Sequence, residues 1–152
     1  MSDKESMIIG FTGTRKGMTE QQKSQVRDLL SVFVVSEAHH GGCKGADSDF
    51  HWAVRDVCGE ELPVTIYPSN FGASAKMDLS SAELEENTSL KGEKDPWERN
   101  KDIIDPCDVI FATPAQPFEE PRGGTWHAVR YSRKTGKKII VIWPDGSVRH
   151  EG

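Results

Sequence analysis

Short apolar runs alternate along the chain with segments whose apolar residues recur at helical spacing. Each run is almost continuously apolar and is followed by a helical segment, which predicts a mostly parallel sheet covered by helices on both faces. The fold class is therefore α/β, a Rossmann-like three-layer sandwich with a five-stranded sheet. The five predicted strands span residues 7–11, 34–38, 63–67, 108–113 and 139–143.

The predicted helices have recognisable starts. Thr19 and Gln22 form a capping-box pattern before the first helix, whose apolar face follows over residues 26–33. Asp95 and Pro96 are typical of a helix start, and we expect that helix to end near residue 104. Two further helices are expected after the glycine-rich turns at 41–45 and 123–124.

One long segment lacks periodicity. Residues 68–95 predict a long loop with one short helix begun by Ser80 and Glu83, and the residues after 143 predict a turn and a polar tail. No repeat of fixed period is present, and 152 residues suit one domain. The sequence therefore predicts a single domain over 1–152 with its core at about 7–143.

Composition limits the cellular compartments and the classes of partner that suit this chain. No apolar run approaches the roughly 18 residues of a membrane span, and residues 1–6 are polar where a signal peptide is apolar. Cys43, Cys58 and Cys107 lack Cys-x-x-Cys spacing, which fits a reducing compartment. We expect a soluble cytoplasmic protein without a membrane partner, and the formal charge of -5 disfavours nucleic acid.

Chemistry is expected at the carboxyl ends of the strands. Glycine-rich turns there let the backbone approach a ligand, and helix N-termini attract anions. Basic residues lie in or beside these turns although the chain is acidic, at Arg15, Lys16, Lys44, Arg99 and Arg122. This placement favours a phosphate-bearing ligand, and the alternative is that these are ordinary solvated loop side chains.

Other kinds of site have less support. The turns lack the patterns G-x-G-x-x-G and G-x-x-x-x-G-K-[ST], which disfavours NAD and a P-loop ATPase, and no cofactor is indicated. His39, His40 and His51 lack the spacing of metal ligands. No metal site is predicted, and buried or surface histidines are the better interpretation.

Four motifs follow one another along the chain. They are Gly10-Phe11-Thr12-Gly13-Thr14-Arg15, Gly42-x-x-Gly45-Ala46-Asp47, Arg99-Asn100 with Ile103-Ile104 and Cys107-Asp108, and Gly124-Thr125 with Ala128. Together, over residues 7–143, they resemble the SLOG superfamily, which includes LOG-type phosphoribohydrolases and the DNA-processing protein A fold. The resemblance implies a strand order of 3-2-1-4-5 and a nucleotide-sized ligand over the first and fourth strands.

The resemblance implies a role for each motif. The first and last motifs would contact phosphate or ribose, and the middle two would line the turn beside them and reach the ligand from a helix. Each role has a structural alternative, in which the glycines serve tight turns, Asp47 caps its helix and Asn100 ties loops together. The predicted ligand-binding residues are Gly13, Thr14, Arg15, Gly42, Lys44, Asp47, Arg99, Asn100, Gly124 and Thr125.

Catalysis is less well supported than binding. Hydrolytic members of the superfamily carry a glutamate in a pattern like P-G-G-x-G-T-x-x-E. Counted from the last motif, that position is Ala128, which has no acid or base, and Arg122 replaces the proline. A substitute serves only if the loops bring it to the anomeric carbon, and the residues considered are Glu119, Glu120, Asp47 and His127, of which the last three are the candidates.

Three functions remain open. The first is a binding module that captures a nucleotide or nucleotide-derived signal and sequesters it, as the resemblance implies for small phage or mobile-element members, with Trp97, Trp126 or Phe71 stacking on the base. The second is an N-glycoside hydrolase acting on nucleoside 5′-monophosphates. The third is DNA binding of the DNA-processing type, which predicts steep salt dependence. The resemblance also implies a homo-oligomer, a dimer or larger.

Overall fold

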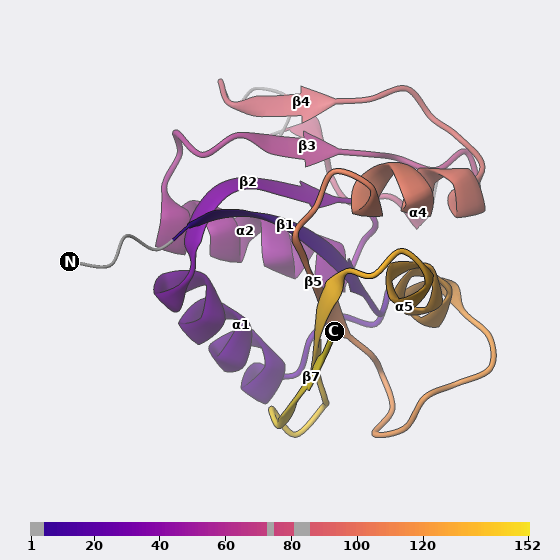
Figure 1. The fold of residues 1–152 in the computed structure, drawn as a ribbon. Coiled ribbons are helices and arrows are strands. Elements are labelled where there is room, and N and C mark those ends of the chain that lie inside the picture. Colours follow the sequence, from indigo (N-terminus) through magenta and orange to yellow (C-terminus); the bar gives the residue numbers. More distant parts are fainter. Residues whose placement is uncertain (1–4, 73–74, 81–85) are drawn as a thin grey trace.

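The computed structural model describes residues 5–72, 75–80 and 86–152. Within these ranges seven strands form one sheet in the order β4-β3-β2-β1-β5-β6-β7 (Figure 1). Neighbouring strands run parallel, except that β7 is antiparallel to β6. The strands are β1 (Ser6–Gly13), β2 (Val34–His40), β3 (Val64–Ile66), β4 (Thr88–Leu90), β5 (Val109–Thr113), β6 (Lys138–Ile142) and β7 (Val148–Glu151).

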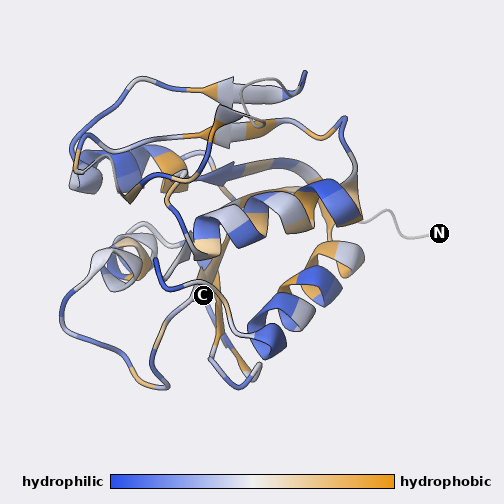
Figure 2. Ribbon diagram, turned by 180° about the vertical axis from the view of Figure 1, so that it is seen from behind, coloured by the Kyte–Doolittle hydropathy of each residue, from blue (hydrophilic) through white to orange (hydrophobic). Residues whose placement is uncertain are grey.

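Helices cover both faces of the sheet. In the described ranges these are α1 (Glu20–Val32), α2 (Ala46–Cys58), α4 (Pro96–Ile104) and α5 (Gly124–Lys134). The first two lie on one face and the last two on the other (Figure 1). Figure 2 shows hydrophilic residues along the outer surfaces of the helices. The predicted three-layer α/β architecture is confirmed.

Alternate residues of the central strands divide the core between the two helical layers. Phe111 and Ile140 belong to the cluster under α1 and α2, whereas Ile110 and Ile139 pack toward α4 and α5. Phe11 of β1 stacks on Phe50 of α2, with ring centroids 4.4 Å apart. Full burial of a side chain of this kind contributes about 1.5–3 kcal/mol. The sheet is thus a rigid base for the turns at its edge.

The predicted five-stranded sheet of order 3-2-1-4-5 is wrong in its number of strands. The five predicted strands are found in that order as β3, β2, β1, β5 and β6, and β4 and β7 extend the sheet at its two edges. β4 lies in the segment predicted to be a loop. The buried Arg55 of α2 holds it in place, because its guanidinium donates to the Leu62 carbonyl and to Thr88 Oγ1, both at 2.8 Å.

β7 occupies the segment predicted to be a polar tail. A turn leads into it, in which the Asp145 carboxylate accepts from the backbone N–H of Ser147 at 2.9 Å. The strand is polar because it lies at the edge of the sheet, where charged residues are common. Arg149 covers Trp143 at 5.0 Å, and Glu151 pairs with α5. Because these partners are distant in sequence, the local pattern of apolar and polar residues did not predict the strand.

The predicted helix caps are confirmed. Thr19 Oγ1 accepts from the Gln22 N–H at 3.0 Å, and Gln22 Oε1 accepts from the Thr19 N–H at 2.9 Å. Asp95 accepts from the Glu98 N–H at 3.2 Å. The starts of α1 and α4 are therefore fixed by local chemistry.

Two further predictions concern where a strand ends and where a short helix lies. β2 continues two residues beyond its predicted end, to His40. The short helix predicted from Ser80 and Glu83 falls mainly on residues 81–85, which lie outside the described residues. Among the residues that are described, no helix is both long and apolar enough to cross a membrane.

Candidate functional site

A cleft of about 450 Å³ lies at the carboxyl ends of β1 and β5. Four segments that are distant in sequence meet around it: the β1–α1 turn, the β2–α2 turn, the buried side of α4, and the loop that leads into α5. The predicted edge of the sheet is thus where the glycine-rich turns converge. The lining residues from the predicted sets are Gly13, Thr14, Arg15, Asp47, Arg99, Asn100, Glu120, Gly124 and Thr125.

The first two turns interlock at the floor of the cleft. The Thr14 carbonyl accepts from the Ala46 N–H at 2.9 Å, and the Thr14 N–H donates to the Thr113 carbonyl at 3.1 Å. Gly13 allows this packing, since a Cβ there would collide with the side chains of Thr113 and Ala46. Gly45 has a φ of 85° and lies against the Arg15 carbonyl, so a side chain is excluded there as well.

Arg99 of α4 holds the β2–α2 turn through hydrogen bonds to backbone carbonyls. Only 7% of it is exposed, and Nη1 donates to the carbonyls of Gly41 at 2.9 Å and Tyr67 at 3.1 Å. Its Nε donates to Asn100 Oδ1 at 3.1 Å. Among the described residues Nη2 contacts only the Cys43 sulfur, at 3.9 Å. Most of this guanidinium is therefore committed to the fold, although Arg99 is also one of the residues that line the cleft.

Asp47 lies in the first turn of α2 and binds the turn before the helix rather than capping the helix. Its carboxylate accepts from the Cys43 N–H at 3.1 Å, and 6% of the residue is exposed. Burial raises the pKa of Asp47, and this effect is opposed by the charge of Arg99 and by backbone donors. Burial likewise raises the pKa of the Cys43 thiol, with the Asp47 charge adding to the effect. The thiol is therefore held in its neutral form.

Asn100 ties α4 to the start of α5. Its Nδ2 donates to the Gly124 carbonyl at 3.4 Å and lies 3.2 Å from His127 Nδ1. The ring of His127 packs on Trp97, with centroids 4.1 Å apart, and burial lowers the pKa of His127. The side chain of Asn100 thus fixes where α5 begins relative to α4.

The N-terminus of α5 has no cap of its own. Gly123 occupies the N-cap position with a φ of 106° and supplies no side-chain hydrogen bond, and the first turn contains no acidic residue. In the described part of the chain, no hydrogen-bond acceptor is present for the N–H groups of Gly124, Thr125 and Trp126. These unpartnered donors, together with the helix dipole, place partial positive charge at an end of α5 that lines the cleft.

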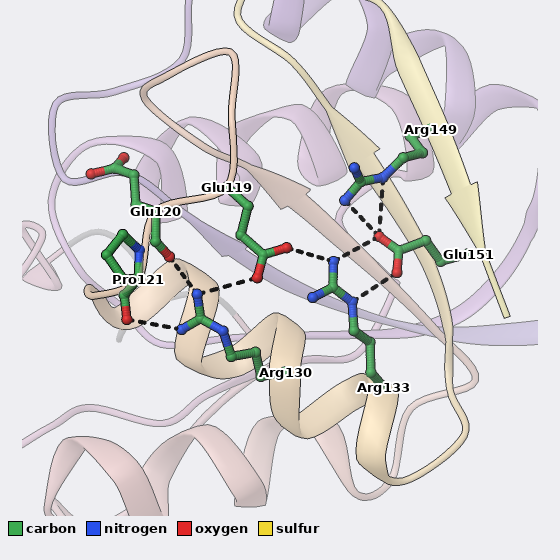
Figure 3. Close-up of polar contacts among 7 residues, drawn as sticks. All are labelled: Glu119, Glu120, Pro121, Arg130, Arg133, Arg149 and Glu151. Carbon is green, nitrogen blue, oxygen red and sulfur yellow. Dashed lines mark hydrogen bonds and ion pairs between the residues drawn. The ribbon is translucent and has the colours of Figure 1, made fainter.

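Unpaired charges surround this helix end. Arg15, Lys16 and Arg122 line the cleft and are exposed, and no ion pair or hydrogen bond engages their charged groups within the described ranges. Glu120 also lines the cleft, and its carboxylate is turned away from the neighbouring arginine (Figure 3). With Arg99 and Asp47 included, four basic side chains face two acidic ones. The cleft therefore favours an anion.

Three predicted residues are not on the cleft wall: Gly42, Lys44 and His127. Gly42 shapes the turn instead, with a φ of 65° and an N–H that donates to His40 Nδ1 at 3.0 Å. Lys44 is exposed, and its N–H donates to the Ala75 carbonyl at 2.8 Å.

The aromatic residues considered for stacking do not form an open platform in the cleft. Trp126 lines it but is 2% exposed and packs against Trp143 at 5.9 Å. Phe71 and Trp97 are exposed but are not among the residues that line the cleft. Ala128, to which the resemblance assigned the position of a catalytic glutamate, is 2% exposed and belongs to the core beneath α4.

Sequence reasoning left several cleft residues out of the predicted site. Lys16 and Arg122 were identifiable as basic neighbours of glycine turns, and their positions beside Arg15 and Gly123 were the available signal. Cys43 lies inside the predicted glycine-rich turn at 41–45, which was its signal. Gln116 carried none, because its place on the wall depends on how distant segments meet.

The histidines are structural in the described residues. His40 and His51 are fully buried, and His40 Nε2 lies 2.9 Å from His51 Nδ1. Because the Gly42 N–H occupies Nδ1 of His40, the proton between the two rings belongs to His40 Nε2. Among the described residues, no group of three or more His, Cys, Asp or Glu side chains is placed to hold a metal ion.

Three solved structures share this architecture. The molybdenum cofactor binding protein from the phototrophic bacterium Rippkaea orientalis has a TM-score of 0.62 and 16% identity, and the match covers 91% of this chain and 77% of that one. DNA processing protein A from Streptococcus pneumoniae has a TM-score of 0.62 and 14% identity, over 88% of this chain and 49% of that one. The structural-genomics target TM1055 has a TM-score of 0.59 and 16% identity, over 87% and 71%.

These matches define the fold. The chain has the SLOG-type Rossmannoid fold that its motifs predicted. It spans about half the length of DNA processing protein A. No model of a known protein family matches the sequence, and no curated protein does.

Proposed function

We propose that this protein binds a phosphorylated small molecule of nucleotide size in the cleft between β1, β5 and α5. The observation that carries the proposal is the uncapped N-terminus of α5, whose three unpartnered N–H groups open onto a cleft with three unpaired basic side chains. A phosphate there accepts from the backbone amides, while Arg15, Lys16 and Arg122 neutralise its charge.

The size of the cleft agrees with this ligand class. A volume of about 450 Å³ lies within the range of about 300–1,000 Å³ typical of small-molecule sites. Two of the structural neighbours are described as a molybdenum cofactor binding protein and a DNA processing protein. The first supports a small ligand at this fold. The acidic net charge of -5 weighs against DNA.

Capture without turnover is the better supported outcome. Ala128 fills the position of the superfamily's glutamate and lies in the core. Asp47 is engaged by the Cys43 N–H, and His127 is off the cleft wall. A protein with this site retains its ligand, which suits sequestration or sensing of a nucleotide-derived signal.

An N-glycoside hydrolase is the second candidate, and Glu120 is the observation that favours it. Its carboxylate lines the cleft and has no ion-pair partner among the described residues. A carboxylate of this kind could stabilise a sugar cation or activate water. Release of free base from a nucleoside 5′-monophosphate, lost in Glu120→Gln, would establish this function instead.

Calorimetric titration of the purified protein tests the proposal. The panel is AMP, ADP, ATP, ADP-ribose, inorganic phosphate and a short DNA duplex. We expect saturable binding of at least one nucleotide with Kd below roughly 1 mM, weakened about tenfold in Arg15→Gln. The matched control is Arg27→Gln, an exposed arginine of α1 that pairs with Asp56 at 3.0 Å. Absence of nucleotide binding, or binding of the duplex alone, would reject the proposal.

A further inference from the structure

The loop at 114–123 forms the outer wall of the cleft. Ala115, Gln116, Glu120 and Arg122 all line the cavity from this segment. In the described part of the chain, no backbone–backbone hydrogen bond involves residues 115–122. A wall of this kind needs side chains from elsewhere to hold its shape.

Two side chains supply that support, one at each end. At the start, Gln22 of α1 is 1% exposed, and its Nε2 donates to the carbonyls of Pro114 and Ile142, both at 2.9 Å. At the far end, Arg130 of α5 donates from Nη1 to the Pro121 carbonyl at 3.2 Å and from Nη2 to the Glu120 carbonyl. These two carbonyls directly precede Arg122. The Arg130 fork therefore fixes the backbone that presents Glu120 and Arg122 to the cleft.

Arg130 is itself held by a network of charges (Figure 3). Its Nη2 pairs with Glu119 at 3.2 Å, and Arg133 pairs with the same carboxylate at 2.9 Å. Arg133 continues to Glu151 of β7 at 2.8 Å, and Arg149 pairs with Glu151 at 2.8 Å. The hydrogen bond from Arg133 lowers the pKa of Glu119, so this carboxylate stays charged near neutral pH. The network joins the loop, α5 and β7.

We propose that Arg130 is a positioning residue of the cleft, which fixes the loop at 114–123 through the Glu120 and Pro121 carbonyls and thereby sets where Glu120 and Arg122 meet the ligand. The role depends on the shape of the guanidinium as well as on its charge, because two carbonyls and a carboxylate are held by one planar group. The ligand part of this inference rests on the proposed function. The loop part does not.

Limited proteolysis tests the loop without any ligand. Phe118 is 57% exposed, so chymotrypsin cleavage after Phe118, followed by mass spectrometry, reports how often the loop opens. We expect roughly tenfold faster cleavage in Arg130→Gln and in Arg130→Lys, since lysine keeps the charge but lacks the fork. The control is Arg149→Gln, which removes a guanidinium of the same network that does not contact the loop.

Titration with the nucleotide found to bind the wild-type protein tests the ligand part. We expect both Arg130 variants to bind roughly tenfold to hundredfold more weakly, with Arg149→Gln within about twofold of wild type. Thermal melts identify a variant that has lost its fold, and Arg130→Lys then carries the comparison. Wild-type cleavage and affinity in Arg130→Lys would overturn the inference, because charge alone would suffice.

The two proposals fail in different ways. Equal acceleration of cleavage in Arg130→Gln and Arg149→Gln would overturn the inference, since it would indicate general loosening of the network. If the wild-type protein binds no nucleotide, the proposed function fails, while the cleavage rates still decide whether Arg130 holds the loop.

Discussion

The N-termini of α2 and α5 border the same cleft but differ in how their backbone donors are used. At α2 the Ala46 N–H is bound by the Thr14 carbonyl, and Asp47 and Asp49 place carboxylates in the first turn. At α5 there is no side-chain cap and no acidic residue in the first turn. Both helices have a glycine at the N-cap, with φ of 85° and 106°.

This contrast indicates which of the two helix ends is open to an incoming anion. The partial positive charge of α2 is already balanced by Asp47, whose carboxylate also holds the Cys43 N–H at 3.1 Å. At α5 the dipole and the amides are unused, and Arg122 lies just before the helix. α2 thus completes the floor of the cleft, and α5 is the end at which we propose that phosphate binds.

The largest effect on stability is expected from removing Arg99, which holds the turn before α2. Arg99→Met takes the donors away from the Gly41 and Tyr67 carbonyls and leaves Asp47 without a compensating charge. We expect the free energy of unfolding to fall by about 2–4 kcal/mol, as measured by urea denaturation.

A double-mutant cycle identifies the cause of that loss. Adding Asp47→Asn to Arg99→Met should recover part of the stability if an uncompensated carboxylate contributes to it. Strictly additive losses would show that only the carbonyl contacts matter. An Arg99→Met variant as stable as wild type would refute the assigned structural role of Arg99.

The second largest effect is expected from acid, which should lower the stability of the fold because His40, beside the turn before α2, is buried. His40 is fully buried, and desolvation lowers its pKa well below 6.5, with the charge of a protonated His51 adding to the effect. The unfolded chain takes up this proton near pH 6.5 and the folded chain does not, so stability falls as pH drops through that range. The slope is up to about 1.4 kcal/mol per pH unit for one proton.

Denaturation curves between pH 7.5 and 5.5 check this expectation. Replacement by His40→Gln should reduce the slope by about one proton, and an unchanged slope would contradict the assignment to His40. Burial also lowers the pKa of His39 and His127, which adds loss of the same sign. Burial raises the pKa of Asp47, which acts in the opposite direction at lower pH, where the folded chain takes up a proton first.

Local chemistry explains what could be predicted from the sequence. The caps at Thr19 and Asp95 depend on neighbours within a few residues, and the five central strands are marked by short apolar runs; all were predicted. The glycine turns at Gly13 and Gly45 also have local signatures, and both meet at the cleft. β4 and β7 were missed because distant partners, such as Arg55 for β4, hold them in the sheet.

The function of an arginine is not a local property. Arg99 and Arg15 were both predicted to bind the ligand, since each lies in one of the four motifs and each carries the charge that phosphate needs. Arg99 is buried because carbonyls 58 and 32 residues away accept from it. Arg15 is exposed and unpaired in the described ranges, so only this one retains its full donor set for a ligand. Folding thus buries one guanidinium and leaves the other exposed.

The smallest effect is expected from a substitution that makes the first turn of α5 resemble that of α2. Thr125→Glu places a carboxylate in the first turn of α5, where Asp47 stands in α2. The charge should favour the helix dipole by about 0.3–1 kcal/mol, so stability is kept or slightly raised. The same charge repels phosphate and competes for the amides, so nucleotide affinity should fall about tenfold, equivalent to about 1.4 kcal/mol. Thr125→Gln is the neutral control of equal shape. If both variants bind as wild type does, the amides of α5 are not the phosphate site, and the contrast between the two helix ends has no bearing on binding.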